Sequence, residues 1–341
     1  MSASGTTHFP GMCKVGFRSA CAIMAAVAGG AASAKGFVMG FDVEGARATY
    51  ALSINTAGSI AGYYLDSNYS EHGFVRGADG KIKTFDARKS APTEPASINS
   101  KGAIAGTYFD ADTGAAHAFV RNPEGKFVRF DAPGSRKTVA LGINDAGSVT
   151  GWYADANGME NGYIRSADGT ITSFVVPQSN STMPKAINRS GAVTGSWMDS
   201  SGQQQGFVRA PGGSLTTFEV SGALAALPQS INDVGAVVGF YLDSGYAEHG
   251  FVFTPDGKTV TFDVPKAVET ELRGINGKGA LAGTFLEQTA SRGVLRMPDG
   301  KLRRFDGPQA NDTVATSIND KSAVAGYYAT FDSIHGFIRM P

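Results

Sequence analysis

The sequence predicts an all-β protein, a seven-bladed β-propeller of four-stranded blades. Three observations support this prediction. An Ile-Asn pair recurs seven times, from Ile54-Asn55 to Ile318-Asn319, at steps of 44, 45, 44, 44, 44 and 43 residues. Such a period is typical of folds in which each unit buries its hydrophobic face against its neighbours. Each unit also contains four short strand-like segments, and the two ends of the chain carry complementary parts of one unit.

The first 34 residues have the composition of a secretory signal peptide. Lys14 and Arg18 are their only charges, and an Ala-rich stretch leads to Ala32-Ser33-Ala34, an A-x-A cleavage site. A retained membrane helix is the alternative, but the apolar stretch is shorter than the ~20 residues that a span needs. We therefore expect a signal peptide over 1–34, a propeller over 35–341, and export to the periplasm or the extracellular space.

Composition narrows the class of protein further. Both cysteines, Cys13 and Cys21, lie in the signal segment, so the mature chain has neither disulfides nor thiol chemistry. Thirty basic residues against thirty acidic ones argue against a nucleic-acid footprint. No later stretch is long enough to span a membrane. We expect a monomer without a cofactor.

The strands of the first unit are predicted at 51–55, 59–66, 72–76 and 81–86. No apolar period of 3.6 residues competes with this interpretation. The first turn reads Asn-x-x-Gly in six units, with Ser322 as the departure in the seventh, and the third turn is mostly Asp-Gly. Asn caps such a turn through its own side chain, and Gly accepts positive φ.

The chain ends explain how the ring closes. The last unit stops at Pro341 after its third strand, whereas 37–43 resembles a fourth strand, with Phe41-Asp42 matching Phe85-Asp86. Pairing the two completes the last blade and removes two exposed sheet edges, which would otherwise invite aggregation.

Several residue types recur in every unit or nearly so. A Gly in the second strand is followed two residues later by an aromatic residue, and a Phe ends the fourth strand; we expect both aromatics to interleave between blades, with the Gly allowing close approach. An Arg ends most third strands, and an acidic residue follows most fourth-strand Phe residues. These charges predict structural ion pairs, with an arginine ring for an anionic polymer as the alternative.

The loop between the second and third strands carries the best candidates for surface chemistry. Carboxylates open this loop and histidines close several copies, while a Thr stands six residues before most of the repeated Asn residues. We expect a structural hydrogen-bond network of Asp, His and Thr, and a metal site is the alternative. Ligands spread one pair per blade lie too far apart to share an ion, so no metal is assigned. The predicted network comprises Asp66, Asp110, Asp155, Asp199, Asp243, His117 and His335.

Two of these loops are nearly identical and differ from the rest. Tyr69 and Tyr246 fall at loop tips, where nothing in the repeat demands an aromatic residue. An exposed ring beside a carboxylate suits a sugar, and an ordinary surface Tyr is the alternative. The predicted ligand-binding residues are Tyr69, Glu71, His72, Tyr246, Glu248 and His249.

The third strands resemble a known bacterial repeat family. His117-Ala118-Phe119-Val120-Arg121 and its variants, together with the Gly-Ile-Asn-Asp-Ala-Gly-Ser-Val-Thr-Gly segment at 142–151, resemble the extracellular HAF (His-Ala-Phe) repeats. The resemblance covers every unit, with the sixth departing most. It implies export from a bacterial cell, and it transfers no catalytic residues.

These patterns favour a secreted, non-enzymatic propeller that binds a cell-surface glycan or protein. The alternative is a polysaccharide-active enzyme, a lyase or a hydrolase, on the same scaffold. Glycoside hydrolysis needs two carboxylates at a defined separation, and lyase chemistry needs a base near an acidic sugar. The sequence singles out no such pair, so no catalytic residue is assigned.

Overall fold

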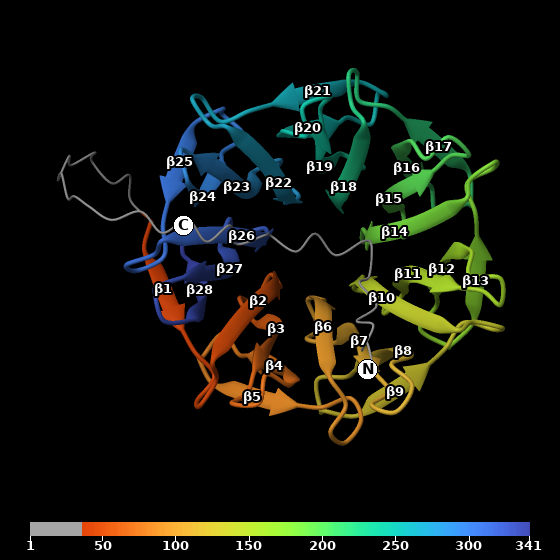
Figure 1. Ribbon diagram of the computed structural model, residues 1–341, viewed down its shortest axis with the longest axis horizontal. Coiled ribbons are helices and arrows are strands. Elements are labelled where there is room, and N and C mark those ends of the chain that lie inside the picture. The colour runs from red at the N-terminus through yellow and green to blue at the C-terminus, as the bar shows by residue number, and fades with distance from the viewer. Residues whose placement is uncertain (1–35) are drawn as a thin grey trace, which may run out of the picture. The chain divides into compact units, whose positions relative to one another are not determined.

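A computed structural model describes residues 36–341; the predicted signal peptide, 1–34, lies outside these residues. They form 28 β-strands and no helix. Successive strands pair antiparallel in groups of four, and Figure 1 shows seven such groups side by side around a common centre. The first strand of each group is innermost and the fourth outermost.

The strands recur at equivalent places in the seven groups. The first strands are β2 (Ala48–Ile54), β6 (Thr93–Ile98), β10 (Lys137–Ile143), β14 (Ser181–Ile187), β18 (Ala225–Ile231), β22 (Glu269–Ile275) and β26 (Asp312–Ile318). The second strands are β3 (Ile60–Leu65), β7 (Ile104–Phe109), β11 (Val149–Ala154), β15 (Val193–Met198), β19 (Val237–Leu242), β23 (Leu281–Glu287) and β27 (Val324–Ala329). The third strands are β4 (Glu71–Arg76), β8 (Ala116–Arg121), β12 (Glu160–Arg165), β16 (Gln204–Arg209), β20 (Glu248–Phe253), β24 (Ala290–Arg296) and β28 (Ile334–Arg339). The fourth strands are β5 (Ile82–Phe85), β9 (Phe127–Phe130), β13 (Ile171–Phe174), β17 (Leu215–Phe218), β21 (Thr259–Phe262), β25 (Leu302–Phe305) and β1 (Val38–Phe41).

Each first strand carries a β-bulge opposite the recurring Gly. In β2 the register shifts between Ala51 and Ser53, and a Cβ on Gly62 would lie 1.9 Å from the Tyr50 carbonyl oxygen. The predicted role of this Gly in close approach is confirmed. The first strand begins earlier than the predicted 51–55, because Thr49 and Tyr50 also pair with β3.

The N-terminal strand joins the last group. β1 pairs antiparallel with β28, from Val38 opposite Arg339 to Phe41 opposite Gly336, as expected from the chain ends. The observed strand is shorter than the predicted 37–43. A parallel bridge between Ala48 and Ile334 then connects β28 to the first group.

The seven repeated Asn side chains link each group to the next. Each Nδ2 donates to the backbone carbonyl of the following Asn at 2.9 to 3.3 Å, and Asn319 donates back to Asn55. Each Oδ1 accepts the backbone N–H four residues on, as in Ser59 to Asn55, which confirms the predicted turn cap. Ser322, which replaces Gly in the last of these turns, also has a positive φ, 61°.

Aromatic rings pack between neighbouring groups. The fourth-strand Phe of one group meets the third-strand ring of the next edge-on; Phe85 and Phe119, for example, have centroids 6.3 Å apart. Four of the seven second-strand aromatics also stack on a histidine of their own group, as Tyr64 does on His72 at 5.2 Å. The second-strand aromatics also pack against the preceding group, as Tyr108 does in one cluster with Ala61 and Phe85, so the prediction of interleaving rings is confirmed for both strands.

The third-strand arginines do not form the predicted ion pairs with the acidic residues. Arg121 lies over the ring of Phe85 at 4.7 Å, and five further groups repeat this contact with the Phe of the preceding group. A guanidinium is weakly hydrated and stacks well on an aromatic face, so it suits this buried position. Phe253, the exception in the sequence, stacks on Phe218 at 4.1 Å and fills the same place.

Candidate ligand-binding site

The loops between second and third strands lie at the same end of the groups as the connections from one group to the next. This follows from antiparallel pairing of successive strands. Parallel bridges confirm it, because Glu160 at the start of β12 lies beside Ser181 at the start of β14, and the Ser181 hydroxyl donates to Glu160 at 2.8 Å. We call this end the loop face.

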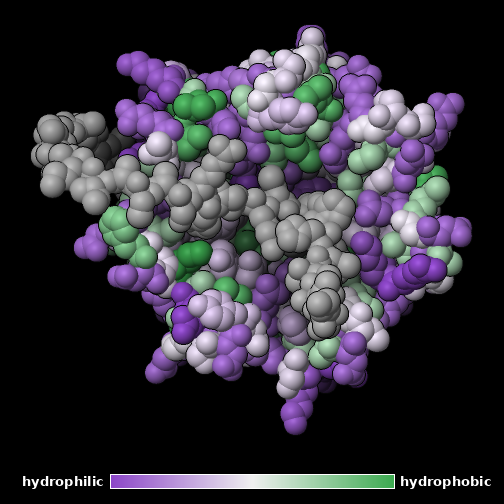
Figure 2. All heavy atoms as spheres, in the orientation of Figure 1, coloured by the Kyte–Doolittle hydropathy of each residue, from purple (hydrophilic) through white to green (hydrophobic). Residues whose placement is uncertain are grey.

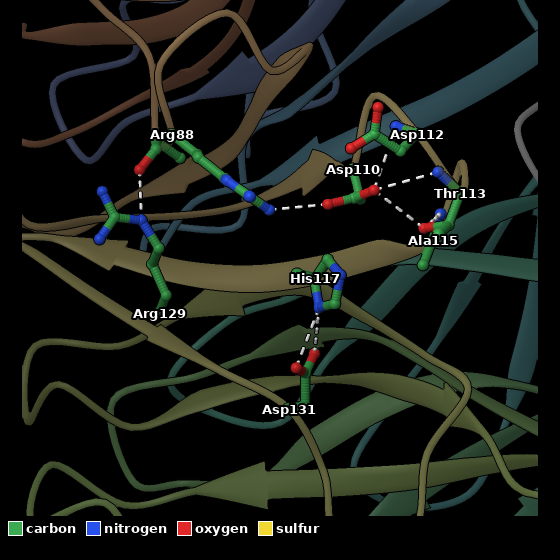
Figure 3. A network of polar contacts seen from close by, with 9 residues as sticks. Arg88, Asp110, Asp112, Thr113, Ala115, His117, Arg129 and Asp131 are labelled. Atoms are coloured by element: carbon green, nitrogen blue, oxygen red, sulfur yellow. Dashed lines mark hydrogen bonds and ion pairs between the residues drawn. The ribbon is translucent and has the colours of Figure 1, made fainter.

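A carboxylate caps five of the seven loops from within. Asp66 Oδ1 accepts the backbone N–H groups of Asn68 and Ser70, both at 2.8 Å. Asp110 does the same for its own loop and also pairs with Arg88 at 2.7 Å (Figure 3). These hydrogen bonds hold the pKa of both carboxyls below the usual range. Asp155, Asp199 and Asp243 cap their loops in the same way.

Each loop histidine is hydrogen-bonded to the acidic residue that follows the fourth strand of its own group. His72 Nδ1 donates to Asp86 at 2.8 Å, and its Nε2 faces Asp66 at 3.6 Å. His117 and Asp131 are paired at 2.9 Å, as Figure 3 shows. His249 and His335 repeat the contact with Asp263 and Asp42. The Asp and His network therefore ties the loop to the outer strand.

The recurring threonines have a separate role. Thr49 Oγ accepts the backbone N–H of Val43 at 3.2 Å, and Thr93 accepts that of Ala87 at 3.1 Å. Four other groups repeat the contact. Thr thus fixes the connection between groups, whereas the predicted network placed it with Asp and His.

We expect His249→Ala to lower the free energy of unfolding by about 1 kcal/mol, the scale of a partly exposed hydrogen bond. Burial opposes the charge on His249, but the hydrogen bonds that the imidazole donates to Asp263 and Asp243 outweigh it and raise the pKa of the imidazole. A raised pKa means that the charge stabilises fully below the unfolded pKa and that this stabilisation is lost as pH rises through the folded pKa. Urea unfolding of both proteins at pH 6 and pH 9 should show a larger difference at pH 6. A difference that grows with pH would contradict this role.

The two predicted loop tips are exposed and share an unusual backbone. Tyr69 is 66% exposed and Tyr246 is 73% exposed. Both have positive φ, 63° and 64°, which bulky residues rarely adopt. At the same loop position the third and fourth groups carry Gly158 and Gly202, both at φ 85°.

The surroundings of the two tyrosines differ. Arg47 Nη1 donates to the Tyr69 hydroxyl at 3.1 Å, and its guanidinium lies 4.8 Å from the ring centroid. The counterpart of Arg47 in the fifth group is Leu224, which is 45% exposed. On the face seen in Figure 2, hydrophobic residues form separate patches among hydrophilic ones.

The glutamates that follow the two tips point away from them, toward the next group. Glu71 is hydrogen-bonded to Glu94 of β6, and Glu248 to Glu271 of β22. Burial, strengthened by the neighbouring carboxyl, raises the pKa of Glu94 and of Glu248 to about 8. Glu94 and Glu248 are therefore mostly protonated at neutral pH.

Sequence reasoning missed Glu94 and Glu271. A signal was present, because Glu occupies their strand position only in the groups that directly follow the two Tyr loops. Its meaning depends on which first strand lies beside which third strand, and the bridges between groups supply that information.

Three tyrosines gather beside the Glu71 and Glu94 pair. Tyr50 stacks on Tyr63 at 4.8 Å and meets Tyr327 edge-on at 5.0 Å. Burial, followed by the charges of its neighbours, raises the pKa of Tyr50 to about 12 and that of Tyr63 further. These hydroxyls stay neutral at physiological pH and line the pair with aromatic surface.

At the opposite end, the repeated Asn residues surround a cavity of about 180 Å³. Arg189 lies between Asp145 and Asp233 there, at 3.6 Å and 3.2 Å, and Asp320 accepts the backbone N–H of Gly277 at 2.9 Å. Within residues 36–341, no group of three or more His, Cys, Asp or Glu side chains is arranged to hold a metal ion. Nor does this part of the chain contain a helix with the length and hydrophobicity to cross a bilayer.

No protein-family model matches the sequence, and no curated protein does. Solved structures match over most of the chain. Streptogramin B lyase has a TM-score of 0.59 at 16% identity, covering 89% of this chain and 97% of that one. The β-propeller domain of the Trilobed protease from Pyrococcus furiosus has a TM-score of 0.59 at 11% identity, covering 86% and 95%. The fold is a β-propeller.

A third match is virginiamycin B lyase from Staphylococcus aureus. Its TM-score is 0.61 at 13% identity, and the alignment covers 90% of this chain and all of that one. At such identities the likenesses establish the propeller fold and leave the activity to be argued from the residues.

Proposed function

We propose that this chain is a secreted, non-enzymatic, seven-bladed β-propeller that binds a cell-surface glycan or protein on its loop face. In this proposal β1 completes the seventh blade and closes the ring. The resemblance to HAF repeats and the composition of residues 1–34 support export from a bacterial cell, to the periplasm or beyond.

The observation that carries the proposal is the pair of exposed, strained tyrosines. A left-handed backbone costs an ordinary residue about 1 kcal/mol, and Gly avoids this cost. The third and fourth groups use Gly at this position, whereas the first and fifth place Tyr69 and Tyr246 there, largely exposed. Residues held in sparsely populated backbone regions concentrate at functional sites.

The enzyme alternative fits the geometry less well. In glycosidases the two carboxyls flank the scissile bond, about 5 Å or more apart. Here Glu71 and Glu94 are hydrogen-bonded to each other, and so are Glu248 and Glu271, which leaves no room for a bond between them. Some structural neighbours are lyases, but the likeness to them is one of fold.

Replacing both tyrosines by Gly separates binding from stability. We expect Tyr69→Gly with Tyr246→Gly to abolish most retention on an insoluble bacterial glycan, and each single change to weaken it modestly, because two separated sites on one polymer act through avidity. The free energy of unfolding should hold or rise, since Gly relieves the strained φ.

The matched control is Val234→Ala, which removes a 66%-exposed apolar side chain from the opposite end. It should leave retention unchanged. Pull-down on a panel of glycans and urea unfolding measure the two effects. Equal retention of the double variant and the parent on every ligand that the parent binds would refute the assignment of these tyrosines.

A further inference from the structure

The two glutamate pairs are copies of one site, and only one copy contains a cation. Three residues of the first copy have counterparts 177 residues later in the second. Glu71 corresponds to Glu248, and Glu94 to Glu271. Tyr63 corresponds to Phe240. In the second copy this spacing places Arg273 where the first copy has Ala96. Both positions lie at the bulge of their first strand.

The second copy shows which chemical group fits. Arg273 forms an ion pair with Glu271, and their side chains are only 18% and 15% exposed. Its guanidinium carbon also lies 6.0 Å from the ring centroid of Phe240. One carboxyl of the pair and an aromatic ring thus contact the guanidinium, whose charge also acts on Glu248.

The first copy presents the same walls without that guanidinium. Tyr63 supplies the ring, Glu71 and Glu94 supply the carboxyls, and Tyr50 adds a second aromatic surface stacked on Tyr63. All four side chains keep partial exposure, as does Ala96 at the vacant position. Part of the surface of each residue around this position is therefore exposed.

We propose that Glu71, Glu94 and Tyr63 form a binding site for the side chain of an arginine from a protein partner. A guanidinium donates to a carboxylate in a planar fork and stacks on an aromatic face, so it uses both walls at once. The site lies beside the Tyr69 loop and shares Glu71 with the ligand-binding residues predicted from the sequence, but it uses neither Tyr69 nor Tyr246. The proposal therefore extends the binding function without depending on the two loop tyrosines.

Proton linkage gives the site a recognisable pH dependence. The groups that face Glu94 are Glu71, Tyr63 and, beyond them, Tyr50 and Tyr327. Tyr50 and Tyr63 stay neutral, and burial with Glu71 raises the pKa of Glu94 to about 8. Below that pH the pair holds a proton that an incoming cation must displace, so binding should release a proton and tighten as pH rises from 6 to 9.

Titration with N-acetyl-arginine amide tests the proposal. Calorimetry on the full chain should give one site in the parent, and at least tenfold weaker binding in Ala96→Arg, which supplies the missing cation internally. Arg273→Ala should create a second site, because it removes the guanidinium that pairs with Glu271 in the second copy. Glu94→Gln should weaken binding as Ala96→Arg does. It provides the same test if Ala96→Arg does not fold.

The neutral isostere N-acetyl-citrulline amide is the control ligand and should not bind. Equal binding of the two amides, or binding by Ala96→Arg equal to the parent, would overturn the site. A glucosamine oligomer is the competing ligand. If it binds the parent more tightly than the arginine amide does, and Ala96→Arg abolishes its binding, the site is assigned to an amino sugar and the arginine assignment is overturned. Loss of glycan retention in the Tyr69 and Tyr246 variants leaves these outcomes unaffected.

Discussion

Deleting residues 35–44 should lower the melting temperature by roughly 10 °C or more. The deletion removes β1, whose four residues pair with β28, and the ring of Phe41, which packs against Phe74 at 6.0 Å. It also removes Asp42, the partner of His335 at 3.0 Å. Losing a packed Phe alone typically costs about 3 to 5 kcal/mol, which corresponds to about 10 °C in a protein of this size.

The same deletion should also change the oligomeric state. Without β1, the outer edge of β28 exposes unpaired backbone groups, which can recruit a strand from another molecule. Size-exclusion chromatography should show dimers and larger species, and a synthetic peptide of residues 35–44 should restore the monomer. The reference is the chain that begins at residue 35. A monomeric deletion variant with the melting curve of the reference would show that β1 does not complete the last group.

The repeat made the strand order and much of the packing predictable. Every unit has to bury the same face, so Gly62, Phe85 and their counterparts follow from recurrence alone. The ends of the chain likewise predicted the pairing of β1 with β28. A residue that each unit needs in order to pack can be recognised in a single sequence, because it recurs in all seven units.

Contacts between different units were harder to predict. Recurrence placed the arginines and the acidic residues at the same period but could not say which of them meet. Arg121 lies on the Phe of the preceding group, while Asp131 goes to His117 of its own. Glu occupies the strand position of Glu94 and Glu271 in only two of the seven units, so it does not appear as a periodic feature of the sequence. Exceptions to the repeat are the residues through which the groups differ in chemistry.

Asn319→Ala should destabilise the protein by about 1 to 3 kcal/mol for each of the two buried groups that it leaves without a partner. The Asn319 Nδ2 donates to the Asn55 carbonyl at 2.9 Å, and its Oδ1 accepts the N–H of Ala323 at 3.0 Å. The first bond joins the last group to the first, so the variant tests closure of the ring.

Asn188→Ala is the matched control, because it removes the equivalent pair of bonds at an internal boundary, to Asn232 and Ala192. In a closed ring the seven boundaries are equivalent, and urea unfolding should give both variants similar losses. In an open ring the boundary between the last and first groups would already be broken, and Asn319→Ala would cost only its own turn cap. A loss for Asn319→Ala much smaller than for Asn188→Ala would therefore argue against closure.

Asn319→Asp separates the two bonds, since it keeps the acceptor for Ala323 but removes the donor to Asn55. The decrease in the free energy of unfolding for this variant should equal the contribution of the bond between groups plus the cost of burying a carboxylate.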